Sequence, residues 1–195
     1  MKPIQITALA VLGAFYIAYF TKMISQRRKG VKTDHIGKGN KPRRLVVTEM
    51  LMKIATYSVV AVEALCIGMN FGMWKSSYAW IGIGVAALGV LVFIVAMITM
   101  RESWRVGIPE RDRTELVTTG IYRMSRNPAF LGFDLMYIGV LIAFFNYIHL
   151  LFVLCATVML HLQILQEEAY LAEAFGETYT EYKKHTGRYL IFDRA

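Results

Sequence analysis

The chain has 195 residues, the size of one domain; 56% of them are hydrophobic and only 18% are charged. Soluble domains carry roughly 25% charged residues, so the composition argues against a soluble protein. The net charge of +8 is spread between apolar runs, which follows the positive-inside pattern and disfavours nucleic-acid binding. We therefore expect an all-α integral membrane protein, with residues 1–195 forming a single domain.

Cysteine and histidine are too sparse and too scattered to indicate a metal centre. Cys66 and Cys155 lie inside separate apolar runs and have no CxxC spacing. The four histidines are far apart in the sequence. The expected state of both cysteines is a buried thiol, and we expect no metal ligand set.

Residues 1–100 contain three apolar runs near the ~20 residues that cross a bilayer. The first, about Pro3 to Ile24, is followed by "SQRRKG" rather than by small residues, so we interpret it as a retained anchor and not a cleaved signal peptide. The other two run from about Val46 to Phe71 and from about Tyr78 to Met100.

Charged residues and glycines within these runs predict internal contacts. In the second run Glu49, Lys53 and Glu63 share a helix face, which must meet protein or water, and the first two can pair. The third run contains "GIGVAALG" without a preceding strand or nucleotide-loop spacing, so helix packing explains its glycines better.

Residues 101–195 are predicted to hold a polar linker from Arg101 to Asn127, two further spans and a charged tail. The spans are expected at about Pro128 to Phe145 and Ile148 to Leu165, joined at Asn146 as an antiparallel hairpin. The tail is rich in tyrosine, and "FGETYTEYKKHTGRYL" is typical of a helix at the membrane interface.

The basic residues indicate the orientation of these five spans. Eight lie between Gln26 and Leu45, six between Arg101 and Asn127, and four in the tail, whereas the turn from Gly72 to Ser77 has one. The N-terminus is therefore expected outside, with both long linkers and the tail in the cytoplasm.

The hairpin brings polar groups to one side of the membrane. Pro128 suits the first position of a helix, with Asn127 as its N-cap, and such a helix start attracts anions, helped here by Arg126. Glu167 and Glu168 lie at the end of the partner helix, and the hairpin brings them back beside Arg126 and Asn127. Anion-binding groups beside carboxylates fit a zwitterionic ligand such as S-adenosylmethionine.

Other residues near this cluster are less specific. Tyr122, Phe130 and Tyr170 are available to contact an adenine ring or a sulfonium. Asp134 either lines a cavity for a lipophilic substrate or bonds to a neighbouring helix.

The stretches "ELVTTGIYRMSRNPAFLGF" and "EEAYLAEAFGETYTEYKKHTGRYL", residues 115–190, resemble the isoprenylcysteine carboxyl methyltransferases and their phospholipid methyltransferase relatives. The resemblance implies S-adenosylmethionine as cofactor and a lipophilic or prenylated acceptor that arrives from the bilayer. It also implies cofactor contacts at Glu115, Leu116, Val117, Tyr122, Asn127, Pro128, Ala129, Phe130 and Glu167.

Two positions depart from the family pattern. Arg126 matches the arginine of an Arg-His-Pro element, but Asn127 stands where the histidine is expected, which puts any imidazole role in doubt. Gln163 is the second departure: isoprenylcysteine enzymes of eukaryotic type look to have an arginine near this position, which binds the substrate carboxylate.

The implied reaction is in-line transfer of a methyl group, with an isoprenylcysteine carboxylate as the favoured acceptor. Arg123 or Arg126 would orient that carboxylate, which needs no base; an amine would need Glu168 or His161 as proton acceptor. The alternatives are an ethanolamine phospholipid N-methyltransferase, a sterol-type reductase with a nicotinamide cofactor, and a non-catalytic scaffold. Membrane lipids are the other expected partners, and the sequence carries no indication of oligomeric state.

Overall fold

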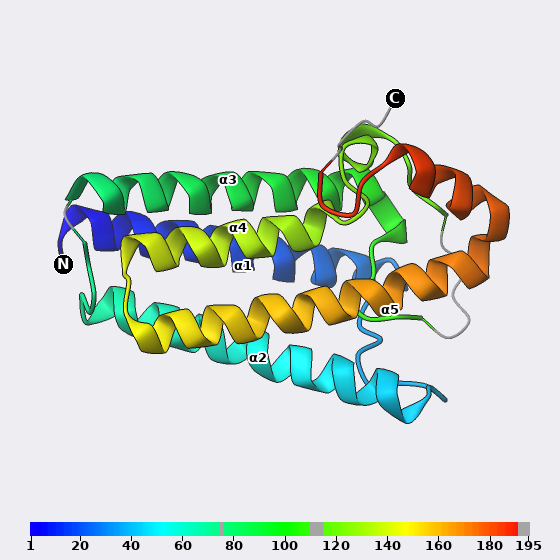
Figure 1. Cartoon of the computed structure of the whole chain (residues 1–195), viewed down its shortest axis with the longest axis horizontal. Helices are drawn as coiled ribbons and strands as arrows, with labels where there is room; N and C mark the ends of the chain where they lie inside the picture. Colours follow the sequence, from blue (N-terminus) through cyan, green and yellow to red (C-terminus); the bar gives the residue numbers. More distant parts are fainter. Residues whose placement is uncertain (75, 110–114, 191–195) are drawn as a thin grey trace.

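The computed structural model describes residues 1–74, 76–109 and 115–190. They form five long helices, and no β-strand occurs among them apart from two isolated bridges. The expected all-α architecture is confirmed (Figure 1). The helices are α1 (Pro3–Arg28), α2 (Arg43–Gly68), α3 (Ser76–Met100), α4 (Pro128–Ala143) and α5 (Tyr147–His185), with short 3-10 helices η1 (Arg101–Ser103) and η2 (Gly120–Arg123) in the second linker.

Four of the five helices, α1, α2, α3 and α5, are long and apolar enough to cross a membrane. The fourth expected span, α4, has 16 residues and so reaches only about 24 Å. This is shorter than the roughly 20 residues of a usual membrane span. In the bundle α4 lies between α3 and α5 (Figure 1).

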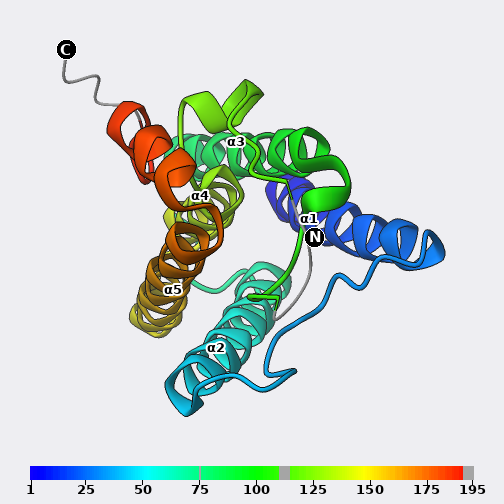
Figure 2. The ribbon, with the colours of Figure 1, turned by 90° about the vertical axis from the view of Figure 1, so that its right-hand side faces the viewer.

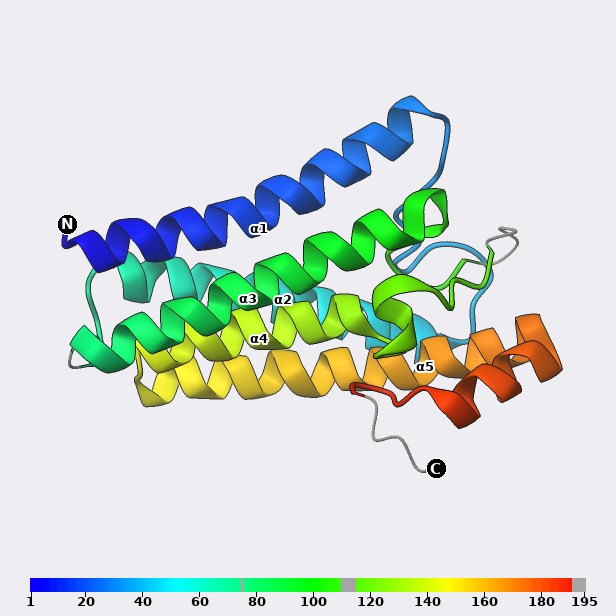
Figure 3. The same cartoon turned by 90° about the horizontal axis from the view of Figure 1, so that it is seen from above.

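The last helix is much longer than its apolar run. We expected it to end near Leu165, but α5 continues to His185, for 39 residues in all. The added segment is rich in Glu and Ala, which favour helix, so polarity alone does not end it. Gly176, with φ 54° and ψ −124°, breaks the helix direction. The chain turns back there (Figure 3), so the predicted tail helix exists as residues 177–185.

Both long linkers and the C-terminal part of α5 lie at one end of the bundle, which we call the linker end (Figure 1). The opposite end holds the two short connections. Asn146 begins α5 there, and its side-chain oxygen accepts a hydrogen bond of 2.9 Å from the amide of His149. The hairpin and its turning point are as predicted.

Glycines bring α3 and α4 into backbone contact, a region we call the glycine seam. A Cβ atom added at Gly82 would lie 2.5 Å from the carbonyl oxygen of Gly139, and one at Gly89 would lie 2.6 Å from the amide nitrogen of Met136. The packing role predicted for these two glycines is confirmed. Gly84 has nothing within 4 Å and takes no part.

A buried carboxylate on α2 holds the two linkers over the bundle. Glu49 accepts hydrogen bonds from the amides of Gly37, at 2.7 Å, and Ile108, at 3.0 Å, and pairs with Lys41 at 2.8 Å. The expected pairing of Glu49 with Lys53 is therefore wrong. One i,i+4 pair is worth little, whereas burial beneath two linkers offers Glu49 two backbone donors as well as a cation.

Candidate functional site

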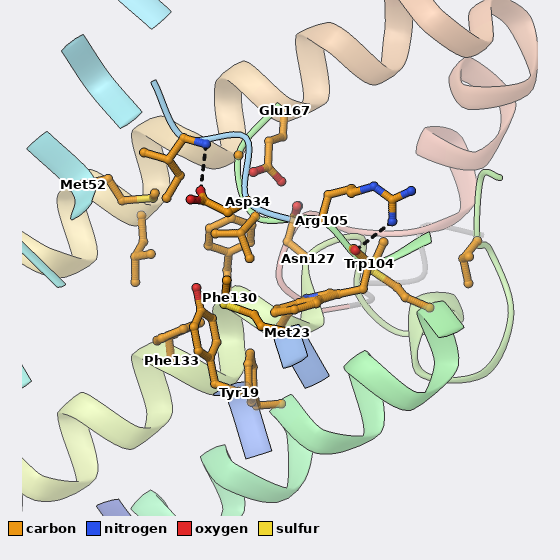
Figure 4. Close-up of a pocket in the computed structure, with 18 of the residues that line it drawn as sticks. Tyr19, Met23, Asp34, Met52, Trp104, Arg105, Asn127, Phe130, Phe133 and Glu167 are labelled. Atoms are coloured by element: carbon orange, nitrogen blue, oxygen red, sulfur yellow. Dashed lines mark hydrogen bonds between the residues drawn. The ribbon is translucent and has the colours of Figure 1, made fainter. Parts of the chain in front are cut away.

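A cavity of about 260 Å³ lies at the linker end, beneath the two linkers. All five helices contribute residues: Tyr16, Tyr19, Phe20 and Met23 from α1, Met52, Lys53, Thr56 and Tyr57 from α2, Phe93 and Met100 from α3, Ala129, Phe130 and Phe133 from α4, and Leu160, Glu167, Leu171, Tyr179 and Tyr182 from α5. Figure 4 shows aromatic rings along its floor and Asp34, Asn127 and Glu167 along its upper side. The wall is thus apolar with a few polar groups, as ligand sites usually are.

Most of the residues that the family resemblance implied as cofactor contacts line this one cavity. They come from three separate segments: the second linker, the start of α4 and the middle of α5. The lining includes Glu115, Leu116, Val117, Tyr122, Asn127, Ala129, Phe130 and Glu167. Pro128 is outside the lining and is buried as the first residue of α4.

The three residues predicted to act in catalysis lie in different surroundings. Arg126 lines the cavity. Glu168 lies behind it, 3.0 Å from Arg126 and 2.9 Å from Arg188, and is not among the lining residues. Arg123 is exposed on η2 and is also outside the lining.

Asn127 occupies the predicted N-cap position, but its side chain does not cap α4. Its amide nitrogen donates instead to Glu168, at 3.1 Å, and to the carbonyl of Arg188, at 3.2 Å. The expected side-chain cap is therefore wrong: the strong hydrogen bond of Nδ2 to a buried carboxylate orients the side chain, and its Oδ1 accepts no hydrogen bond from the amides at the start of α4.

The segment after α5 returns to the start of α4 and supports this wall. The amide of Arg126 donates to the carbonyl of Gly187 at 2.9 Å, and the hydroxyl of Ser125 donates to the carbonyl of Arg188 at 3.2 Å. The hydroxyl of Tyr182 donates to the carbonyl of Tyr122 at 2.5 Å. The C-terminal segment thus covers one side of the cavity.

Burial, hydrogen bonds and neighbouring charges shift the pKa of three groups in or beside the cavity. Burial opposes ionisation of Asp34, but hydrogen bonds from Lys38 and the amide of Ile36 outweigh it and leave the pKa of that carboxyl below its usual value. Burial, and then Tyr182 and Glu167, raise the pKa of Tyr122, which therefore stays a neutral phenol. Hydrogen bonding to Glu168 raises the pKa of Arg188, despite partial burial.

Several cavity residues were not found from the sequence. Asp34 and Lys53 lie more than sixty residues before the family pattern, and only the folding of the linkers over α2 brings them to it. Tyr179 and Tyr182 line the cavity, whereas Tyr170, the expected aromatic of this segment, does not. Their spacing of three residues after the Gly176 break was the available signal.

Other polar residues considered from the sequence lie away from the cavity. Asp134 is buried on α4, and His161 bonds through Nδ1 to the hydroxyl of Tyr189 at 2.5 Å. Gln163 is buried and donates to Glu167 at 3.0 Å, so this position supports a lining residue without reaching the cavity itself.

A family model described as phospholipid methyltransferase matches residues 77–178, slightly more than half of the chain. The chain belongs to the phospholipid methyltransferase family. The match runs from α3 through the second linker and α4 into the bent end of α5, so it covers the glycine seam and all nine residues implied as cofactor contacts.

Curated relatives of this family member carry a more specific name. A protein-S-isoprenylcysteine O-methyltransferase of Schizosaccharomyces pombe is 32% identical over 112 residues, which is 56% of this chain and 48% of that protein. One of Dictyostelium discoideum is 30% identical over 118 residues, 59% of this chain and 48% of that protein. A probable one of Oryza sativa subsp. indica is 26% identical over 155 residues, 74% of this chain and 81% of that protein.

The chain spans about half the length of the first two of these relatives. The resemblance recognised in residues 115–190 is confirmed by the family match and by these names.

Proposed function

We propose that this family member is a membrane methyltransferase that uses S-adenosylmethionine to methylate the carboxylate of a lipophilic, isoprenylcysteine-type acceptor. The observation that carries the proposal is the convergence of three separate segments, residues 115–117, 126–130 and 167, on one cavity. The printed names of the relatives support the acceptor class.

The residues present fit the cofactor. The Nε atom of Arg126 is buried and has no partner among the residues that the structure describes, so a donor remains free for the cofactor carboxylate. Glu167 would accept from its ammonium or ribose hydroxyls, and Tyr122 and Phe130 offer aromatic surface. When bound, S-adenosylmethionine supplies a methyl group on a sulfonium.

The opposite side of the cavity suits a lipid tail. Tyr16, Phe20 and Met23 of α1 face Met52 and Tyr57 of α2 across it. The two helices diverge toward the linker end (Figure 2), and since side chains of both line the cavity, we infer that a lipid tail would enter between them from the acyl chains of a membrane. A lipophilic acceptor then reaches the site from the bilayer without crossing water.

The surroundings favour a nucleophile that is already ionised. A carboxylate needs no proton removed: a carbon–oxygen bond forms, the carbon–sulfur bond breaks, and the products are a methyl ester and a thioether. An amine would need a base, yet neither predicted proton acceptor, Glu168 or His161, lines the cavity. Glu168 is held by two arginines, which keep it ionised but occupy its oxygens.

The orientation in the membrane remains our proposal from charge. Both linkers lie at the same end as the cavity, and they carry most of the basic residues, so we infer that the cavity opens to the cytoplasm and that the N-terminus is outside. In a Cys66→Ser, Cys155→Ser background, a cysteine introduced at Lys32 should react with an impermeant maleimide only after the membrane is opened. Labelling of this cysteine in intact cells would indicate the opposite orientation.

The deciding experiment offers methyl-labelled S-adenosylmethionine and a panel of acceptors to the purified protein. We expect label on an S-prenylated N-acetylcysteine, released by base as methanol because carboxyl methyl esters hydrolyse. Base-stable label on phosphatidylethanolamine would instead indicate the N-methyltransferase that the family description allows. Binding of a nicotinamide dinucleotide with no binding of S-adenosylmethionine would indicate the reductase.

A further inference from the structure

Lys53 is a charged residue in an apolar membrane helix and faces the cavity from α2. It is the eleventh residue of α2, so it lies about 15 Å along the helix from its linker end. A lysine at such a depth is costly and usually serves a binding or transport function. Its neighbours on this face, Met52, Thr56 and Tyr57, also line the cavity.

Among the residues that the structure describes, none forms an ion pair or a hydrogen bond with the ammonium of Lys53, although its charge contributes to lowering the pKa of Asp34. Glu49, one turn earlier on the same helix, is occupied by Lys41 at 2.8 Å. Asp34 also lines the cavity, but its carboxylate is taken by Lys38, at 2.5 Å, and by the amide of Ile36, at 3.1 Å. Glu49 and Asp34 therefore each form an ion pair with another lysine.

The other cations of the cavity are engaged. Arg126 pairs with Glu168, and Arg105 donates to the carbonyls of Glu102 and Trp104. Lys53 reaches the cavity from α2, whereas the implied cofactor contacts come from the second linker, α4 and α5.

We propose that Lys53 binds the anionic head group of the lipid-tailed acceptor and so selects for anionic acceptors. This inference rests on the proposed methyl transfer and deepens it. One oxygen of an acceptor carboxylate would lie against the ammonium of Lys53, and the other would remain free to receive the methyl group. The methyl ester product is neutral and loses this attraction, so the same lysine favours substrate over product.

The test compares binding of an acid with its neutral amide, using S-adenosylhomocysteine so that nothing is methylated. The probes are an S-farnesylated N-acetylcysteine and its carboxamide, titrated into the purified protein in micelles. The wild-type protein should bind the acid at least about tenfold more tightly than the amide. Lys53→Gln should bring the two within about twofold, and Lys53→Arg should keep most of the preference.

Arg44→Gln is the matched control, since Arg44 is an exposed cation on the same helix outside the cavity. It should leave the preference for the acid intact. A wild-type protein that binds acid and amide equally overturns the proposal without any variant. So does a Lys53→Gln protein that keeps the preference, or one whose affinity for S-adenosylhomocysteine falls as far as its affinity for the acid.

A phosphate in a phospholipid head group offers the same anionic chemistry. A lysophosphatidylethanolamine arm distinguishes the source: dependence on Lys53 for the farnesylcysteine alone identifies the carboxylate, and dependence for the lysolipid alone identifies the phosphate. Because binding is measured without turnover, failure of the wild-type protein to methylate any acceptor would reject the proposed function and leave the Lys53 result to stand by itself.

Discussion

The glycine seam and the gap between α1 and α2 are opposite solutions to helix packing in one bundle. In the seam, backbones touch: a Cβ at Gly139 would lie 2.3 Å from the amide nitrogen of Ala86. At the gap, the backbones of α1 and α2 lie close near the opposite end, where Gln5 donates to the carbonyl of Ile67 at 2.6 Å, and they diverge toward the linker end (Figures 2 and 3).

The two regions divide the work of the cavity. Residues 126–130, implied in cofactor binding, stand at the start of α4, whose position the seam fixes against α3. The apolar wall toward the membrane stands on α1 and α2, which no comparable seam joins. A methyl donor that must be aligned gains from a fixed wall, whereas a lipid tail needs an opening.

The largest effect is expected at Arg126, on the fixed side. Arg126→Gln removes the cation beside Glu168 and the donor proposed for the cofactor carboxylate, while Glu168 keeps Arg188 at 2.9 Å. Affinity for S-adenosylmethionine, measured by calorimetry, should fall about 100-fold. Arg123→Gln, three residues earlier and exposed, should change it less than about twofold. Equal losses in the two variants would mean that general positive charge, not the cavity, binds the cofactor.

The seam itself can be opened by one methyl group. Gly82→Ala places a Cβ 2.5 Å from the carbonyl oxygen of Gly139 and 2.6 Å from the amide nitrogen of Ala143, so α3 and α4 must separate. We expect a loss of about 1–3 kcal/mol in the free energy of unfolding, followed by thermal unfolding in micelles.

Gly84→Ala is the control for this substitution, because Gly84 lies two residues away on the same helix and has nothing within 4 Å. Its stability should be unchanged or slightly higher, since alanine favours helix over glycine. If both variants unfold at the same temperature, contact between the backbones of α3 and α4 does not fix their spacing.

A smaller loss is expected at Glu167. Glu167→Gln keeps the shape of the side chain and removes its charge, so a charge-assisted hydrogen bond to the cofactor becomes a neutral one. Affinity for S-adenosylmethionine should fall about tenfold. Glu173→Gln, on an exposed position of the same helix, should have no effect. An unchanged affinity in Glu167→Gln would remove this residue from the cofactor site.

The sequence predicted the fixed side better than the open side, and the reason is physical. Local signals predict local structure: the apolar runs, the hairpin at Asn146 and the packing of Gly82 and Gly89 all follow from neighbours in the chain. The partner of Glu49 could not be predicted in this way. Lys41, and not the expected Lys53, pairs with it because the first linker folds back over α2.

The same distinction explains the errors at the C-terminal end. Helix propensity carries α5 past the charged residues where hydropathy alone ends it. Asn127 is a good N-cap by residue type, but its Nδ2 donates to a carboxylate forty-one residues later, and this bond orients the side chain differently from a cap. Contacts between residues so far apart in the sequence depend on the tertiary fold, and local patterns in a single sequence do not predict them.

The smallest effect is expected on the open side, at Tyr57. Its ring lines the cavity beside the gap and is also partly exposed to the membrane, so Tyr57→Ala removes apolar contact from a lipid tail without touching the residues implied in cofactor binding. The KM for a farnesylated acceptor should rise about two- to threefold, with the affinity for S-adenosylmethionine unchanged. Leu65→Ala, exposed on the same helix but outside the cavity, is the control.

The effect should disappear with an acceptor whose tail is a single isoprene unit, because a tail that short would not extend into the gap. A loss independent of tail length would mean that Tyr57 acts on the head group, and the gap would no longer be the route of the lipid.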